Sequence, residues 1–255
     1  MLLALGALGN GTAQSEAEAG LRDSLKKIAS MPASKPVLIK LRDFWQQSFF
    51  DKLNRLSNFY YKQKGALLYR WIFRRFGKGS YIRKPLLITS PKFVSIGDAV
   101  SIRDGVRLEA IQDSKVRDPN LSIGNNTNIE QNVHIICHSR IQIGNNVSIT
   151  GNCSIVDVTH PYSDVHDPTK IGARIQNDES YVEIGDGSFI GYGTVILPNV
   201  RIGTYAIIGA NSVVVGDIPD YTVAAGAPAR IIKRFNPESG SWIKVCSEIV
   251  EKINE

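Results

Sequence analysis

His160 stands at the start of a polar segment and is the strongest candidate for chemistry in this sequence. The residues that follow it, from Pro161 to Asp167, include a tyrosine, a serine, two aspartates and a second histidine. An imidazole accepts and releases protons near neutral pH, so it is a common general base in enzymes. A histidine beside such a segment is placed to meet a ligand, and the alternative is a histidine with no catalytic role.

Asp157 lies three residues before His160. A carboxylate at that spacing can accept a hydrogen bond from the imidazole and hold one ring tautomer, as it does in catalytic triads. We therefore predict Asp157 as the orienting partner of His160, and the alternative is a solvated aspartate without that role. Which of these applies depends on how the chain around the two residues folds.

The sequence around His160 repeats with a period of six residues. In the clearest part, from Ile184 to Val214, an aliphatic residue recurs at every sixth position, and a small or β-branched residue follows four positions after each of the first five. These aliphatic positions are Ile184, Ile190, Ile196, Ile202, Ile208 and Val214. A six-residue period matches neither a helix of about 3.6 residues per turn nor a two-sided strand.

This period is typical of a parallel β-helix, in which short strands meet at corners and each turn buries its aliphatic residues against the next turn. Earlier hexads keep the register at Ile96, Ile102, Leu108, Ile123, Ile129, Ile135, Ile143, Ile149 and Ile155. Three hexads make one triangular turn, so we expect about five turns, interrupted near residues 110–120 and over residues 161–181. The alternative, a sandwich of regularly spaced strands, does not account for so many successive hexads.

Three segments together resemble the hexapeptide-repeat acyltransferases: VDVTHPYSD (residues 156–164), the hexads from Ile184, and GDIPDYTVAAGAPARIIKR (residues 216–234). The resemblance covers roughly Ile96 to Arg234. It is closest to the bacterial polysaccharide sugar O-acetyltransferases and to the maltose and galactoside acetyltransferases. It implies an all-β fold, a left-handed parallel β-helix. The left hand comes from the resemblance alone, because strand crossovers are generally right-handed.

The resemblance also implies roles for individual residues. The matching histidine of the family, His160 here, is the general base that takes a proton from a sugar hydroxyl, which then attacks the thioester of acetyl-CoA. In the family, acetyl-CoA lies in a groove between adjacent subunits of a homotrimer. The predicted cofactor-binding residues of this chain are Gly191, Ala210 and Ala227 along the pantetheine arm, and Arg230 and Lys233 at the phosphates. Glycine and alanine are also what the coil itself needs at such positions.

The acceptor side departs from the family pattern. The maltose and galactoside branch has an asparagine thirty residues before its base, and that position here is Glu130, with Asn132 the nearest asparagine. A carboxylate would not stabilise an oxyanion, so a backbone N–H group is expected to serve instead. We predict that a sugar or glycan acceptor contacts Glu130, Asn132, Tyr162 and Asp164.

Two other functions are compatible with the same fold. Some hexapeptide β-helices are γ-type zinc carbonic anhydrases, which need three histidines that converge on one metal. His134 and His160 each lie five residues after their aliphatic residue and His138 lies three after its own, on different sides of the triangle, so we expect them not to converge and predict no metal site. The other alternative is a non-catalytic β-helix scaffold, which the intact THP and AGAPAR segments argue against.

A basic segment precedes the repeats. Residues 35–84 carry thirteen Lys and Arg against two acidic residues, a net charge of +11, whereas the whole chain carries +6. Aromatic residues and leucines recur at helical spacing from Pro36 to about Phe76, so we predict a basic, aromatic helical arm. One hypothesis is that this arm lies on an anionic membrane surface, and the alternative is that it packs on the β-helix or on a neighbouring subunit. Nucleic acid is not a predicted partner, since no recognised binding motif accompanies the charge.

The predicted organisation has four parts: a disordered or leader segment (1–34), the arm (35–84), the β-helix acyltransferase domain (85–234) and a C-terminal helix (235–255). Leu86 and Ile88 are expected to form a strand that caps the first turn. No run of about 18 apolar residues predicts a membrane span. Three cysteines without metal spacing indicate a reducing compartment, so we expect a cytoplasmic protein, with the inner face of the membrane as a second location.

The sequence therefore predicts an enzyme, an acetyl-CoA-dependent sugar O-acetyltransferase of bacterial surface-polysaccharide biosynthesis. N-acylation of an amino sugar stays open, because the same base could serve an amine.

Overall fold

The computed structural model describes residues 47–112, 118–175 and 179–245, so the predicted leader at 1–34 lies outside the described residues. The chain divides into two compact units, Met1–Ser57 and Asn58–Glu255. The helical segments of the arm are α3 (Phe49–Lys64), a π-helical turn (Gly65–Tyr69) and α4 (Arg70–Ile72). None of the described helices combines the length and apolar character needed to cross a membrane.

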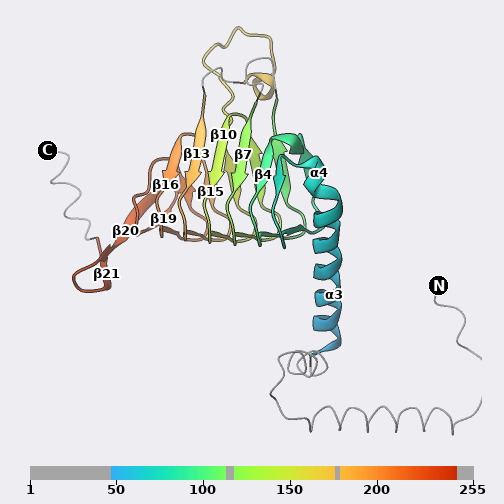
Figure 1. Ribbon diagram of the computed structural model, residues 1–255. Coiled ribbons are helices and arrows are strands. Elements are labelled where there is room, and N and C mark those ends of the chain that lie inside the picture. Colours follow the sequence, from blue (N-terminus) through green and yellow to red (C-terminus); the bar gives the residue numbers. More distant parts are fainter. Residues whose placement is uncertain (1–46, 113–117, 176–178, 246–255) are drawn as a thin grey trace, which may run out of the picture. The chain divides into compact units, whose positions relative to one another are not determined.

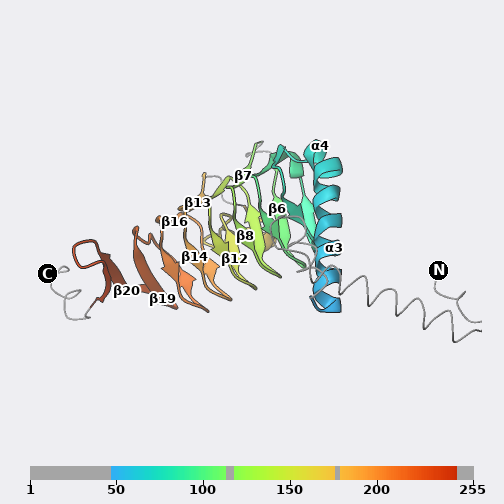
Figure 2. The same ribbon diagram turned by 60° about the horizontal axis from the view of Figure 1, so that its bottom comes forward.

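The second unit is built mainly of three parallel sheets, and each turn of the chain adds one strand to each sheet (Figure 1). The first sheet contains β1 (Arg75–Phe76), β4 (Val94–Ile96), β7 (Asn120–Ile123), β10 (Arg140–Ile143), β13 (Tyr181–Ile184) and β16 (Val200–Ile202). The second contains β2 (Tyr81–Ile82), β5 (Ser101–Ile102), β8 (Asn128–Ile129), β11 (Ser148–Ile149), β14 (Phe189–Ile190), β17 (Ile207–Ile208), β19 (Thr222–Gly226), β20 (Ala229–Asn236) and β21 (Ser241–Lys244). The third contains β3 (Leu87–Thr89), β6 (Arg107–Ala110), β9 (His134–Cys137), β12 (Ser154–Val156), β15 (Val195–Ile196) and β18 (Val213–Val214). Figure 2 shows strands of the other faces, including β8, β12 and β14.

Strand pairing follows the hexads, which confirms the predicted parallel β-helix and its register. Ile143 of β10 lies between Ile123 and Ile184 of the neighbouring turns, and the second and third sheets pair their isoleucines in the same way. All of the predicted aliphatic positions are at most 3 % exposed. The core is therefore a set of stacked aliphatic columns inside the coil.

The corners between strands need backbone in the left-handed region. Asn146 has φ 55°, and the equivalent corners of the adjacent turns are Asn126 with φ 54° and Gly187 with φ 69°. Asparagine and glycine adopt this conformation more readily than other residues, which explains their frequency in the hexads. Tyr205 and Tyr221 occupy the equivalent corners of the next two turns, and their rings stack with centroids 5.7 Å apart.

The β-helix begins one turn earlier than predicted. The helix predicted to continue to about Phe76 ends at Ile72. Strands β1, β2 and β3 form a complete turn that pairs in parallel with the next turn, made of β4, β5 and β6. Phe76, Ile82 and Ile88 supply the hexad positions of this turn. Strand β3 is thus one side of a full turn rather than an isolated cap.

The C-terminal end also differs from the prediction. The coil continues through residues 217–226, because Ile218 bridges to Ile202 and β19 pairs in parallel with β17. For the residues that the structure describes, the prediction of a C-terminal helix is wrong. Strands β20 and β21 form an antiparallel hairpin there, in which the ring of Trp242 packs on Phe235. The free edge of β20 gives the backbone of residues 241–244 hydrogen-bonding partners that a helix would not use. Residues 246–255 of that prediction lie outside the described residues.

Ile190 tests the core directly, because its side chain is fully buried in the column of the second sheet. Replacing it with alanine should lower the free energy of unfolding by about 2–5 kcal/mol, since the lost methyl and methylene groups leave a cavity. Chemical denaturation followed by circular dichroism measures this change. The exposed neighbour Phe189 is the matched control, and Phe189→Ala should cost much less. A loss below about 0.5 kcal/mol for Ile190→Ala would contradict the register.

Candidate active site

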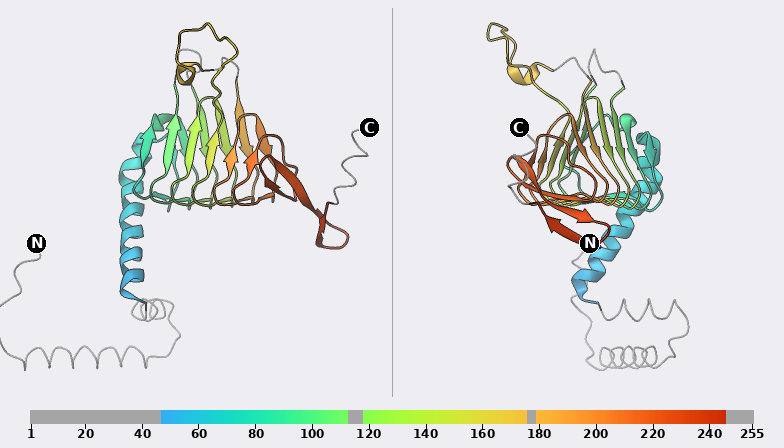
Figure 3. Two further views of the ribbon diagram at one scale, coloured as in Figure 1. Left: turned by 180° about the vertical axis from the view of Figure 1, so that it is seen from behind. Right: turned by 90° about the vertical axis from the view of Figure 1, so that its left-hand side faces the viewer.

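His160 lies on the long loop between β12 and β13, which projects away from the coil (Figure 3). Its side chain is exposed, and its Nδ1 atom lies 2.8 Å from the backbone oxygen of Arg174. A carbonyl oxygen can only accept, so Nδ1 carries the proton in this hydrogen bond. In the neutral imidazole, Nε2 is then left with the lone pair that a general base requires.

Arg174 holds this loop together through its side chain. The guanidinium donates to three backbone oxygens, those of Thr169 at 2.9 Å, Asp164 at 2.8 Å and Asp167 at 2.6 Å, and it lies 3.2 Å from the Asp167 carboxylate. The backbone N–H of Thr169, followed by its hydroxyl, lowers the pKa of the Asp167 carboxyl, and Arg174 adds to this effect. One residue therefore fixes the loop with its side chain and the imidazole with its carbonyl group.

The predicted hydrogen bond between Asp157 and His160 does not form. The Asp157 carboxylate is buried and accepts from the backbone N–H groups of His138, Ser139 and Arg140, the last two at 2.9 and 2.7 Å. Burial raises the pKa of this carboxyl, and the three N–H groups oppose that shift. The tight turn at residues 138–140 leaves these N–H groups without strand partners, so the Asp157 carboxylate anchors the turn. The predicted role of Asp157, to orient the His160 ring, is filled by the backbone oxygen of Arg174.

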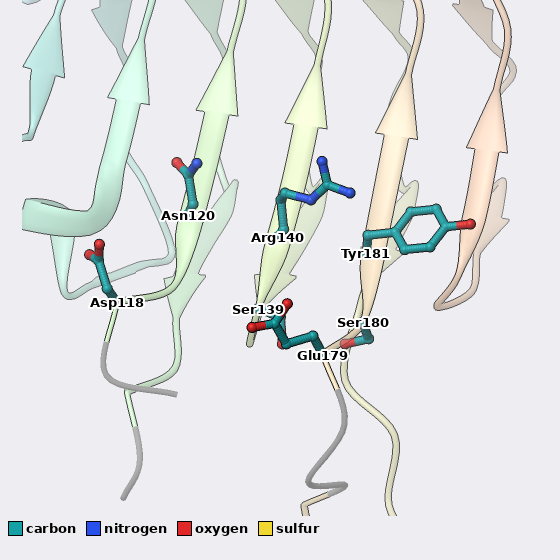
Figure 4. Close-up of a pocket in the computed structure, with 7 residues that line it drawn as sticks. All are labelled: Asp118, Asn120, Ser139, Arg140, Glu179, Ser180 and Tyr181. Atoms are coloured by element: carbon teal, nitrogen blue, oxygen red, sulfur yellow. The ribbon is translucent and has the colours of Figure 1, made fainter. Parts of the chain in front are cut away.

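A polar pocket of about 320 Å³ lies on the first sheet, at the root of the His160 loop. It is lined by Asp118, Asn120, Ser139, Arg140, Glu179, Ser180 and Tyr181 (Figure 4). A guanidinium nitrogen of Arg140 lies 2.9 Å from a carboxylate oxygen of Glu183, and the guanidinium carbon lies 5.6 Å from the centre of the Tyr181 ring. The Ser180 hydroxyl donates to the Asp157 backbone oxygen, so the pocket wall is bonded to the residue where the loop begins.

The pocket and Arg174 are features that the sequence analysis did not find. The lining residues come from β7, β10, β13 and the segments before them, and no short motif connects them. Arg174 is fourteen residues from His160 and lies outside the repeats, so the six-residue period gives no signal for it. Along β10 and β13 less buried and buried residues alternate, and Arg140 and Tyr181 are among the less buried ones, which is the one signal in the sequence that relates to the pocket.

The predicted acceptor residues come from two segments of the coil, the residues after strand β8 and the loop that carries His160. Glu130 pairs with Arg103 at 3.7 Å, and Asn132 forms a corner of the coil with φ 57°. Tyr162 and Asp164 lie on the same loop as His160 and are exposed, and the Asp164 carboxylate accepts from the backbone of His166. These four residues therefore stay predictions as acceptor contacts.

The predicted acetyl-CoA residues lie towards the C-terminal turns. A side chain on Gly191 would come within 2.5 Å of the backbone nitrogen of Ala210, so the two turns touch at this corner and only glycine fits there. The hairpin of β19 and β20 begins on the next turn and carries the exposed Ala227 and Arg230 and the half-buried Lys233. These small and basic residues therefore lie in the last turns of the coil and the hairpin that follows them, and their contacts with acetyl-CoA stay a prediction.

The histidines of the zinc hypothesis lie in different environments. His134 is on strand β9, whereas His138 is buried beyond the end of that strand, with Nδ1 3.4 Å from the Ser139 hydroxyl. Within the described ranges, no three His, Cys, Asp or Glu side chains are grouped as metal ligands. Cys137 and Cys153 are buried free thiols, and Cys246 lies outside the described residues.

Comparison with known proteins adds independent information. Residues 181–216 match the family model of the bacterial transferase hexapeptide (six repeats). A putative lipopolysaccharide biosynthesis O-acetyl transferase of Escherichia coli, WbbJ, is 32% identical over 167 residues, which cover 64% of this chain and 83% of WbbJ. The galactoside O-acetyltransferase of Escherichia coli is 38% identical over 120 residues, which cover 46% of this chain and 55% of that enzyme.

Among solved structures, a similar fold occurs in AntD, an N-acyltransferase from Bacillus cereus in complex with dTDP and 3-hydroxybutyryl-CoA. The TM-score is 0.55 at 23% identity, with 73% of this chain and 91% of AntD covered. At this identity the likeness shows the fold, and together with the hexapeptide match it confirms the left-handed parallel β-helix. Given the match to most of the length of WbbJ, this chain belongs to the hexapeptide-repeat acyltransferase family.

Proposed function

We propose that this chain is a sugar O-acetyltransferase, which transfers an acetyl group from acetyl-CoA to a sugar hydroxyl in the synthesis of a bacterial surface polysaccharide. The observation that carries the proposal is the His160 imidazole, exposed on its loop and fixed through Nδ1 by the Arg174 carbonyl group. The acceptor class rests on the similarity to WbbJ and to galactoside O-acetyltransferase, whose names state lipopolysaccharide biosynthesis and a galactoside.

The proposed reaction uses the free lone pair of His160. The sugar hydroxyl gives its proton to Nε2 as its oxygen bonds to the carbonyl carbon of the acetyl thioester. The tetrahedral intermediate then collapses, the C–S bond breaks, and the proton on Nε2 passes to the departing CoA thiolate. Proton, acetyl group and electron pair are thereby conserved, and the imidazole returns to its starting form.

The polar pocket at the root of the loop is the proposed acceptor region. Its carboxylates, amide, hydroxyls and guanidinium can each donate or accept hydrogen bonds, which suits a ligand rich in hydroxyl groups. The position supports the proposal, because the pocket wall is bonded to Asp157, where the His160 loop begins.

The proposed assembly is a homotrimer that holds acetyl-CoA between adjacent subunits. The pantetheine arm would lie along the outer surface at Gly191, Ala210 and Ala227, and Arg230 and Lys233 would bind the phosphates. Use of acetyl-CoA supports a cytoplasmic location for the reaction.

Replacing His160 with alanine should lower kcat by about 10²–10⁴-fold, because the general base is removed while the loop keeps its Arg174 bonds. Thiol release from acetyl-CoA, measured with a panel of hydroxyl and amino sugars, gives the rate and distinguishes O- from N-acylation. His166→Ala on the same loop is the matched control and should retain activity. A His160→Ala rate near that of the unmodified chain, with an unchanged melting temperature, would refute the assignment.

Acetyl-CoA at 100 times its dissociation constant should stabilise the chain by about 2.7 kcal/mol, because it binds only the folded state. For a domain of this size, that corresponds to an increase in Tm of roughly 5–10 °C. Thermal unfolding with and without acetyl-CoA measures this without knowledge of the acceptor, and acetate at the same concentration is the control. An unchanged Tm at millimolar acetyl-CoA argues for another donor.

Arg174→Lys should lower kcat by about ten- to a hundredfold and leave KM for acetyl-CoA nearly unchanged. Lysine keeps the charge, but its three N–H donors sit on one nitrogen and cannot match the planar guanidinium, whose three separate nitrogens reach three different carbonyl groups, so the backbone carbonyl of residue 174 no longer holds His160 in place. The discriminating measurement is the same substitution in the His160→Ala background, where it should have little further effect. If the two effects multiply instead, Arg174 does not act through His160.

A further inference from the structure

The part of the arm that belongs to the second unit has two apolar faces. One face packs on the first turn of the β-helix, where Gly65, Tyr69 and Phe73 are buried. The rings of Tyr69, Phe73 and Phe76 lie 5.4 Å apart, centre to centre, and close this end of the core. This face accounts for the capping role of the arm.

The other face has no described partner. It consists of Phe59, Tyr60, Leu67, Leu68, Trp71 and Ile72, all of them exposed. Tyr60 is 61% exposed and Trp71 is 76% exposed, far more than a cap on the coil requires. The same type of residue continues at helical spacing in the sequence of the first unit, with Phe49, Leu53 and Leu56. We call the six residues of the second unit the outer face of the arm.

The segment that carries the outer face is basic. Residues 58–76 contain five Lys and Arg and no acidic residue, and two of the five, Arg74 and Arg75, pair with Asp118 and Asp98 of the coil. Lys62, Lys64 and Arg70 contact the rings of Tyr81, Tyr69 and Trp71, and no described carboxylate forms an ion pair with them. Arg70 lies 4.9 Å from the centre of the exposed Trp71 ring. A basic, aromatic and aliphatic surface is thus presented on one helical segment.

We propose that the outer face of the arm docks on an anionic membrane surface. Trp, Tyr and Leu beside Lys and Arg form the combination that inserts at the boundary of lipid headgroups and acyl chains. Anionic headgroups would neutralise the basic residues, whereas the same face of a second copy would bring like charges together. The docking is peripheral, because no described helix can span a bilayer. Docking of the outer face is independent of the acetyl transfer proposed for His160.

Co-sedimentation of the full chain with vesicles tests the proposal. Vesicles of phosphatidylcholine with about one third phosphatidylglycerol should bind the chain at least about tenfold more tightly than pure phosphatidylcholine at low salt, and added salt should reduce the difference. Leu67→Ser combined with Trp71→Ser should abolish most of this binding, because it removes apolar contacts with the acyl region. Both side chains are exposed, so the melting temperature should not change.

The matched control is Val165→Ser combined with Val215→Ser, which removes two other exposed apolar side chains and should leave vesicle binding unchanged. Arg70→Glu should weaken binding to anionic vesicles but not to neutral ones. Equal partitioning onto both vesicle types, or unchanged binding of the Leu67 and Trp71 variant, overturns the proposal. A smaller assembly for that variant by light scattering, without any vesicle binding of the unmodified chain, would assign the outer face to a second copy instead.

Discussion

The rest of the structure depends on one constraint, the burial of every sixth residue against its equivalent in the next turn. Parallel strands lie about 4.8 Å apart, so a continuous column of isoleucines forms only if each side of a turn keeps the same length. Ile143 between Ile123 and Ile184 is one such step. Extra residues can therefore leave the coil only at a corner. The long excursion between β12 and β13 does so, and it is the segment that carries His160.

Because this loop lies outside the columns, apolar burial cannot hold its conformation. Polar contacts do so instead: Arg174 binds three carbonyl groups of the loop, and the buried Asp157 secures the turn beside its start. This explains why the sequence predicted His160 but not its partner. The aspartate three residues away suggested a triad-like pair, yet three unpaired backbone N–H groups compete for the same carboxylate. The carbonyl group that orients the imidazole belongs to no side-chain pattern, so only the folded loop identifies it.

The coil itself was predictable over most of its length, because period-six burial is a local property that the residues display directly. The first turn was missed because two periods overlap there. Phe76, Ile82 and Ile88 follow the six-residue period, while the residues before Phe73 follow a helical one. At the other end, the segment around Trp242 is compatible with a helix or a strand by composition. The exposed edge of β20 decides in favour of the strand, and that edge exists only once the coil has formed.

The arm shows how one helical segment can serve two surfaces. A β-helix has an open apolar end at its first turn, and repeat folds need a cap there. Tyr69 and Phe73 meet that need on one side of the segment. A cap alone would leave the opposite side polar, as on most surface helices. Here Leu67 and Trp71 make that side apolar at a cost in solubility, and basic residues surround them. An exposed apolar patch of this kind is typical of an interaction site, which capping of the coil does not explain.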